Sequence, residues 1–150
     1  MVILLIALAI ATTTRVVLPA RQDEPSKHQG VTAAADSTAI AHGRYLVHHV
    51  ALCVECHSPR DDDGRLLSMK LLEGGFIPVA PVRPELIHRP WAFTPPRIAG
   101  LPAGYSRQEL VTLLTEGTRP DGTLPRAPMP PFRMSESDAR AVVAYLESLR

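Results

Sequence analysis

Aromatic residues are scarce in this chain of 150 residues, where Phe, Trp and Tyr make up 5% of a composition that is 45% hydrophobic. So few large rings make a thin conventional core, and a bound apolar group could supply the missing bulk. Lysine is also rare, with two among sixteen basic residues, so the sequence offers no lysine-rich docking ring. The net charge of +1 gives no electrostatic reason to expect nucleic acid or an acidic substrate.

The two cysteines of the chain lie three residues apart, in Cys53-Val54-Glu55-Cys56-His57. A disulfide between them would close a tiny loop and stabilise little. A zinc site would need a second tight pair of ligands, and a thioredoxin-like pair would need a βαβ context. The pattern instead predicts one covalently attached haem c. Each thiol would add across a porphyrin vinyl group, with His57 as the proximal iron ligand.

The first twenty residues are the longest hydrophobic stretch, with an unbroken apolar run over residues 1–11 and Arg15 as the one charge. The stretch is long enough for a membrane anchor, and it also has the apolar region of a signal peptide but no basic start. We favour an uncleaved anchor, and either reading predicts export of the chain. Residues 21–35 are predicted to form a polar linker, and residues 36–150 the globular domain.

Helix signals recur in three places along this domain. Asp36-Ser37-Thr38 offers an N-cap for a helix over residues 39–52. Ser106-Arg107-Gln108-Glu109 is a capping box for a helix over residues 107–116, which ends at Gly117. Ser135-Glu136-Ser137-Asp138 begins the last helix, whose apolar residues recur at helical spacing. A short helix is also predicted over residues 66–72.

Proline is concentrated in the segments that connect these helices. Twelve of the fifteen prolines fall between Pro78 and Pro131, so this region can be neither continuous helix nor central strand. The sequence therefore predicts an all-α fold of three main helices with long, rigid, proline-rich loops.

A low-spin electron-transfer haem needs a second axial ligand, and Met129 is our first candidate. It lies between Pro128 and Pro130 in a loop with few conformations, and a thioether favours Fe(II). Met134, His88 and an open or water-ligated iron are the alternatives. The expected metal ligands are thus His57 and Met129.

Several polar side chains could surround a haem. Trp91 could donate its N–H to a propionate or simply pack in the core. The sequence does not choose a propionate partner among three arginines, Arg83, Arg89 and Arg97. Three histidines in the first helix are expected at the surface, namely His42, His48 and His49.

The order and spacing of these motifs resemble those of a known family. The matching pieces are residues 43–47, the attachment stretch 53–60, Leu72-Glu73-Gly74-Gly75, residues 116–122, Met129-Pro130-Pro131-Phe132 and residues 135–146. They span residues 37–150, about three quarters of the chain. Together they resemble the class I cytochromes c, in particular the single-haem domains that serve as electron-transfer subunits of bacterial dehydrogenases and respiratory complexes.

The resemblance implies thioether bonds at Cys53 and Cys56, a proximal His57 and a distal Met129. It also implies that the first and last helices cross, with Gly43 and Tyr45 against Tyr145. The family matures outside the cytoplasm, so the domain is expected on the periplasmic side of a bacterial membrane, tethered by residues 1–20, or exported and soluble after cleavage. The chain departs from the family pattern in one place. Related domains are expected to carry an asparagine in the segment before Pro95-Pro96, and here that segment reads Trp91-Ala92-Phe93-Thr94.

The expected function is one-electron transfer between protein redox partners of a respiratory or photosynthetic membrane complex, with no catalytic residues and no small-molecule substrate. One alternative is a haem enzyme or sensor whose open distal site binds peroxide or a small gas. Another is a structural subunit whose haem only stabilises the fold.

Overall fold

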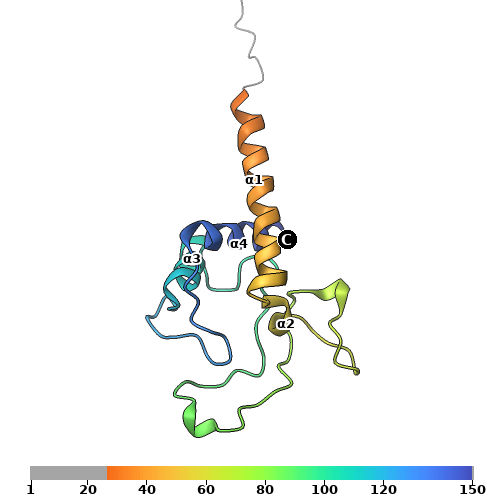
Figure 1. Ribbon diagram of the computed structural model, residues 1–150, viewed down its shortest axis with the longest axis vertical. Coiled ribbons are helices and arrows are strands. Elements are labelled where there is room, and N and C mark those ends of the chain that lie inside the picture. The colour runs from red at the N-terminus through yellow and green to blue at the C-terminus, as the bar shows by residue number, and fades with distance from the viewer. Residues whose placement is uncertain (1–26, 150) are drawn as a thin grey trace, which may run out of the picture.

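The computed structural model describes residues 27–149. Its longer helices are α1 (Lys27–Tyr45), α3 (Arg107–Glu116) and α4 (Glu136–Ser148), and α2 (Cys53–His57) is a single short turn. A π-helical turn over Leu46–Val50 continues α1. Two 3₁₀ turns lie in the loops, over Ser68–Lys70 and Pro84–Leu86. The described residues contain no named strand. The predicted all-α fold with three main helices and long loops is therefore confirmed (Figure 1).

The first helix is longer than predicted. It begins at Lys27 rather than after Asp36-Ser37-Thr38, so residues 27–35 of the predicted polar linker are helical, and their role as a linker stays a prediction. Alanine is the strongest helix former, and Ala33-Ala34-Ala35 favours continuation of the helix through the weaker residues that follow. The rest of the predicted linker and the predicted anchor or signal peptide lie outside the described residues. No helix in the described part of the chain is long and apolar enough to cross a membrane.

Helices α1 and α4 cross (Figure 1), and Gly43 lies at the contact between them. A Cβ atom there would lie 1.9 Å from the carbonyl oxygen of Ala141 and 2.9 Å from Cβ of Tyr145. The predicted role of Gly43 at this crossing is therefore confirmed. The predicted partner of Tyr145 was wrong, because the Tyr45 side chain is exposed and its ring packs beside His49.

His48 takes that place. Its Nε2 lies 2.7 Å from the hydroxyl of Tyr145, and the two rings meet edge to face. The expectation that His48 is a surface residue is corrected, since its side chain is half-buried in this crossing. His42 and His49 are exposed as predicted, and His42 also contacts α4 through Asp138 at 2.7 Å.

The predicted capping signals are confirmed at helices α3 and α4. Ser106 and Glu109 form both hydrogen bonds of the capping box of α3, and Gly117 ends the helix at φ 69°. Ser135 accepts from the backbone N–H of Asp138 at the start of α4. The helix predicted over residues 66–72 is reduced to the 3₁₀ turn Ser68–Lys70.

The hydrophobic core lies where α1, α3 and α4 meet the loops. Apolar burial is the main favourable contribution to the stability of such a core. Its buried members are Val47, Val54, Leu72, Ile98, Ala99, Leu110, Val111, Leu113, Leu114, Ala139, Val142, Val143, Tyr145 and Leu146. The side chains of α3 and α4 in this set form a base on which the loops of the site rest.

Candidate cofactor site

A cavity of about 590 Å³ lies beside the core. Its walls come from α2, from the loop segment Pro95-Pro96, from the buried faces of α3 and α4, and from the loop over residues 119–132. Most of the lining side chains are apolar. A pocket of this size and character suits a large, flat, apolar ligand with few polar groups.

The attachment stretch forms one wall of this cavity. Leu52, in the left-handed region at φ 52°, separates the π-helical turn from α2. The turn of α2 then presents Cys53, Cys56 and His57 to the cavity. We call α2 together with Pro95-Pro96 the attachment wall.

Both cysteine thiols are free and half-buried. Burial raises the pKa of Cys53 to about 11 and also raises the pKa of Cys56. Reactive redox pairs of the thioredoxin kind have lowered thiol pKa values, so the surroundings of these thiols disfavour that reading. No group of three or more potential ligands from His, Cys, Asp and Glu gathers in the described residues, which gives a closed zinc site no support there.

His57 is oriented by a backbone contact. Its Nδ1 lies 2.8 Å from the carbonyl oxygen of Pro96, and because a carbonyl can only accept, Nδ1 carries the proton. Nε2 then has a free lone pair, which is the form in which histidine binds a metal. Burial lowers the pKa of His57 and so favours the neutral ring, against a smaller raising effect of the Pro96 carbonyl.

The chain around His57 is fixed by further hydrogen bonds. The buried Ser58 Oγ accepts from the N–H of Leu72 at 2.9 Å. The N–H of Gly74 donates to the carbonyl of His57, and that of Gly75 donates to the carbonyl of Pro95. The attachment wall is thus tied to the following loop on both sides of the imidazole.

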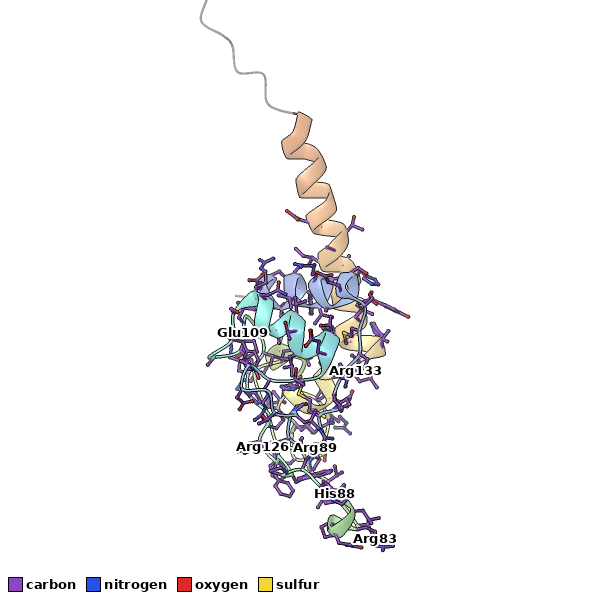
Figure 2. The ribbon with its side chains drawn as sticks, turned by 90° about the vertical axis from the view of Figure 1, so that its left-hand side faces the viewer. Arg83, His88, Arg89, Glu109, Arg126 and Arg133 are labelled. Carbon is purple, nitrogen blue, oxygen red and sulfur yellow. The ribbon has the colours of Figure 1, made fainter. Side chains whose placement is uncertain are left out.

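Met129 lines the same cavity from a different segment. We call residues 124–132 the methionine loop. Met134 does not line this cavity; it packs against the core and lines a small pocket beside α3. His88 is exposed and lies far along the loop that projects from the body (Figure 2). Of the three candidate distal ligands, Met129 is the one that lines the same cavity as His57.

The arginines proposed for the propionates have other contacts. Arg83 pairs with Glu85, and Arg97 pairs with Glu73 at 2.7 Å. Arg89 instead donates to two carbonyls of the methionine loop. The two arginines that line the cavity are Arg119 and Arg126. Sequence reasoning missed both, because nothing in their local pattern separates them from surface arginines.

Trp91 has a buried indole N–H without an acceptor in the described part of the chain. Burying such a donor unpaired is costly, and its neighbour Ala92 lines the cavity. An acidic group of a bound ligand would satisfy the donor. This observation favours the propionate reading of Trp91 over simple packing.

The family model of cytochrome c matches residues 40–150. The chain belongs to the cytochrome c family. No curated protein matches the chain. The predicted recognition is confirmed, whereas the domain boundary at residue 36 stays a prediction.

Cytochromes c carry covalent haem c, and Cys53 and Cys56 fit its attachment site. The rest of the site also fits the group. The cavity is large and apolar, a histidine next to the cysteines is in the metal-binding tautomer, and a buried tryptophan N–H lacks an acceptor. Membership of this family supports a role as a haem-dependent electron carrier.

Proposed function

We propose that this cytochrome c is a single-haem carrier tethered to the periplasmic face of a bacterial membrane. It passes one electron at a time between protein partners of a respiratory or photosynthetic complex. His57 and Met129 are the proposed axial ligands of its iron. The observation that carries the proposal is that both side chains line one cavity, although 72 positions separate them along the chain.

Haem c supplies, when bound, a one-electron couple between Fe(II) and Fe(III). The residues of the chain set the conditions for that couple. Cys53 and Cys56 fix the group to α2, and the Pro96 carbonyl keeps the imidazole of His57 in one tautomer. The apolar lining limits water, and together with a thioether ligand it favours the reduced state.

The tether is supported by the apolar residues 1–20 and by the length of α1. At 1.5 Å per residue the nineteen residues of α1 span about 28 Å. Figure 1 shows the N-terminal part of α1 extending beyond the crossing with α4, away from α2. If residues 1–20 are a membrane anchor, α1 would hold the cytochrome domain at a distance from the membrane surface.

The proposed ligation is tested by Met129→Ala in the holoprotein. We expect a lower reduction potential and an iron that binds cyanide or carbon monoxide, since the thioether is lost. Met134→Ala is the control and should keep the parent spectrum. An unchanged spectrum and potential in Met129→Ala would show that Met129 is not the ligand. A parent protein that already binds these ligands readily would favour the haem enzyme or sensor.

The tether is tested by following the protein through cell fractionation. The full chain should stay with the membrane, and its measured mass should include residues 1–20. A version in which a cleavable signal peptide replaces these residues should be soluble in the periplasm. Recovery of the full chain as a soluble periplasmic protein would contradict the tether. If the full chain stays with the membrane, its capture from detergent-solubilised membranes would identify the partner complex.

A further inference from the structure

Arg89 connects the projecting loop to the methionine loop. Its Nη1 donates to the carbonyl of Pro125 at 2.7 Å and to the carbonyl of Met129 at 3.2 Å. One nitrogen therefore bridges two carbonyls four residues apart, on either side of the segment that leads into Met129. In Figure 2, Arg83 lies at the far tip of the projecting loop and His88 next, while Arg89 lies closer to the body at the level of Arg126.

Backbone pairing brings Arg89 to this place. The N–H of Ala127 donates to the carbonyl of Pro90 at 3.0 Å, and the N–H of Ala92 donates to the carbonyl of Ala127 at 2.6 Å. Trp91 and Ala127 thus form a parallel bridge. Because Arg89 directly precedes the paired residue Pro90, this pairing places its side chain beside the methionine loop.

The methionine loop has few donors of its own. Four of the seven residues 125–131 are proline and carry no backbone N–H. Within the loop, Met129 donates its N–H to the carbonyl of Arg126 at 3.1 Å. The carbonyls of Pro125 and Met129 therefore depend on a donor from elsewhere, and Arg89 supplies it.

The charge of Arg89 strengthens these contacts. Arg83 and Arg97 pair with carboxylates, whereas Arg89 forms no ion pair in the described part of the chain. Its side chain is half-buried. Hydrogen bonds from a charged donor are stronger than neutral ones, and partial burial limits competition from water.

We propose that Arg89 is a positioning residue for the distal ligand. It keeps the backbone of Met129 in the place from which the thioether reaches the iron, and its loss lets the methionine loop move away. This inference rests on the proposed ligation by Met129. It adds a determinant of ligand retention that lies forty positions earlier in the chain.

The test compares holoproteins carrying Arg89→Met, Arg89→Lys and the control Arg83→Met. Imidazole is titrated into the ferric proteins, because it binds only when Met129 leaves the iron. Arg89→Met should bind imidazole about tenfold more tightly than the parent, the equivalent of one lost charged hydrogen bond. Arg89→Lys keeps the charge and one donor group and should lie between the two. Arg83→Met should match the parent.

A second readout follows the loop itself by hydrogen–deuterium exchange. The amides of Ala127 and Met129 should exchange faster in Arg89→Met and not in Arg83→Met. Unchanged exchange and imidazole affinity would overturn the proposal. So would a shifted reduction potential with unchanged exchange, because Arg89 would then act through its charge alone. A failure of Met129→Ala to alter imidazole binding would instead overturn the ligation, while faster exchange in Arg89→Met would still show that Arg89 orders the loop.

Discussion

The attachment wall and the methionine loop are built in different ways around one cavity. In the attachment wall, α2 comes soon after the α1–α4 crossing along the chain, and the hydrogen bonds join backbone groups, the buried Ser58, and the His57 ring with the Pro96 carbonyl. The methionine loop contains no helix, and it is held by its prolines, by the Trp91–Ala127 bridge and by Arg89 from another loop. The difference teaches that the proposed proximal ligand, His57, is held by contacts beside the helix crossing, whereas the proposed distal ligand, Met129, is held by contacts between loops.

The largest effect is expected at the crossing beneath the attachment wall. Helix propensity alone would make Gly43→Ala stabilising by about 1 kcal/mol. The new Cβ would lie 1.9 Å from the carbonyl oxygen of Ala141, so the helices must separate. We expect a net loss of about 3 kcal/mol in the free energy of unfolding, measured by denaturant titration.

The control on the same helix is Ala41→Gly, at an exposed position. It should cost about 1 kcal/mol through propensity alone. Stabilisation by Gly43→Ala would show that the helices do not approach as closely as described. It would also show that the attachment wall does not lie beside a tight helix crossing, which is the feature that distinguishes it from the methionine loop.

A smaller effect is expected at Ser58. Ser58→Ala removes the hydroxyl oxygen that accepts from the backbone N–H of Leu72. The side chain of Leu72 is fully buried, so water cannot easily replace this acceptor. An unpaired buried donor should cost about 2 kcal/mol in the free energy of unfolding. Ser68→Ala, at an exposed position of the 3₁₀ turn, should change it by less than about 0.5 kcal/mol. Equal effects of the two substitutions would mean that Ser58 does not stabilise the attachment wall.

The smallest expected effect is a dependence of stability on pH through His48. Burial, and then the charges of Arg44 and His49, lower the pKa of His48 below its usual value. The unfolded chain therefore binds a proton more readily, and the contribution of His48 is complete above its usual pKa and is lost as pH falls toward the lower folded value. Tyr145, whose hydroxyl faces His48, has a pKa raised by burial and stays neutral in this range.

The control is His48→Gln, whose side-chain oxygen can still accept from the hydroxyl of Tyr145 without titrating. Unfolding of the two proteins is compared from neutral to mildly acid pH. The parent should lose more stability than His48→Gln on acidification. Parallel curves would show that the protonation of His48 is not linked to folding.

Local signals in the sequence predicted much of this molecule. The attachment motif, the capping box at Ser106 and the glycine stop at Gly117 depend on neighbouring residues, so they could be read directly. The partner of Tyr145 depends on how two distant helices rotate against each other, and the prediction of Tyr45 in place of His48 was wrong for that reason. The early start of α1 is not marked by a cap, because the capping residues Asp36-Ser37-Thr38 predict a later start and the alanine run before them favours helix without fixing where it begins.

The candidate site shows the same division. Residues 53–57 and the proline-flanked Met129 were named from sequence, and the structure places them along one cavity. The roles of Pro96 and Arg89 come from contacts 39 and 40 positions apart in the chain. No local pattern distinguishes a carbonyl that accepts from His57, or an arginine that bridges two carbonyls, from their neighbours.

The most direct test of the account is X-ray absorption at the iron of the oxidised holoprotein. The fine structure should contain one sulfur scatterer at bonding distance together with five nitrogens, four from the porphyrin and one from His57. Loss of the sulfur in Met129→Ala would assign it to that residue. An iron surrounded by nitrogen or oxygen alone in the parent protein would contradict the proposed ligation and the comparison built on it.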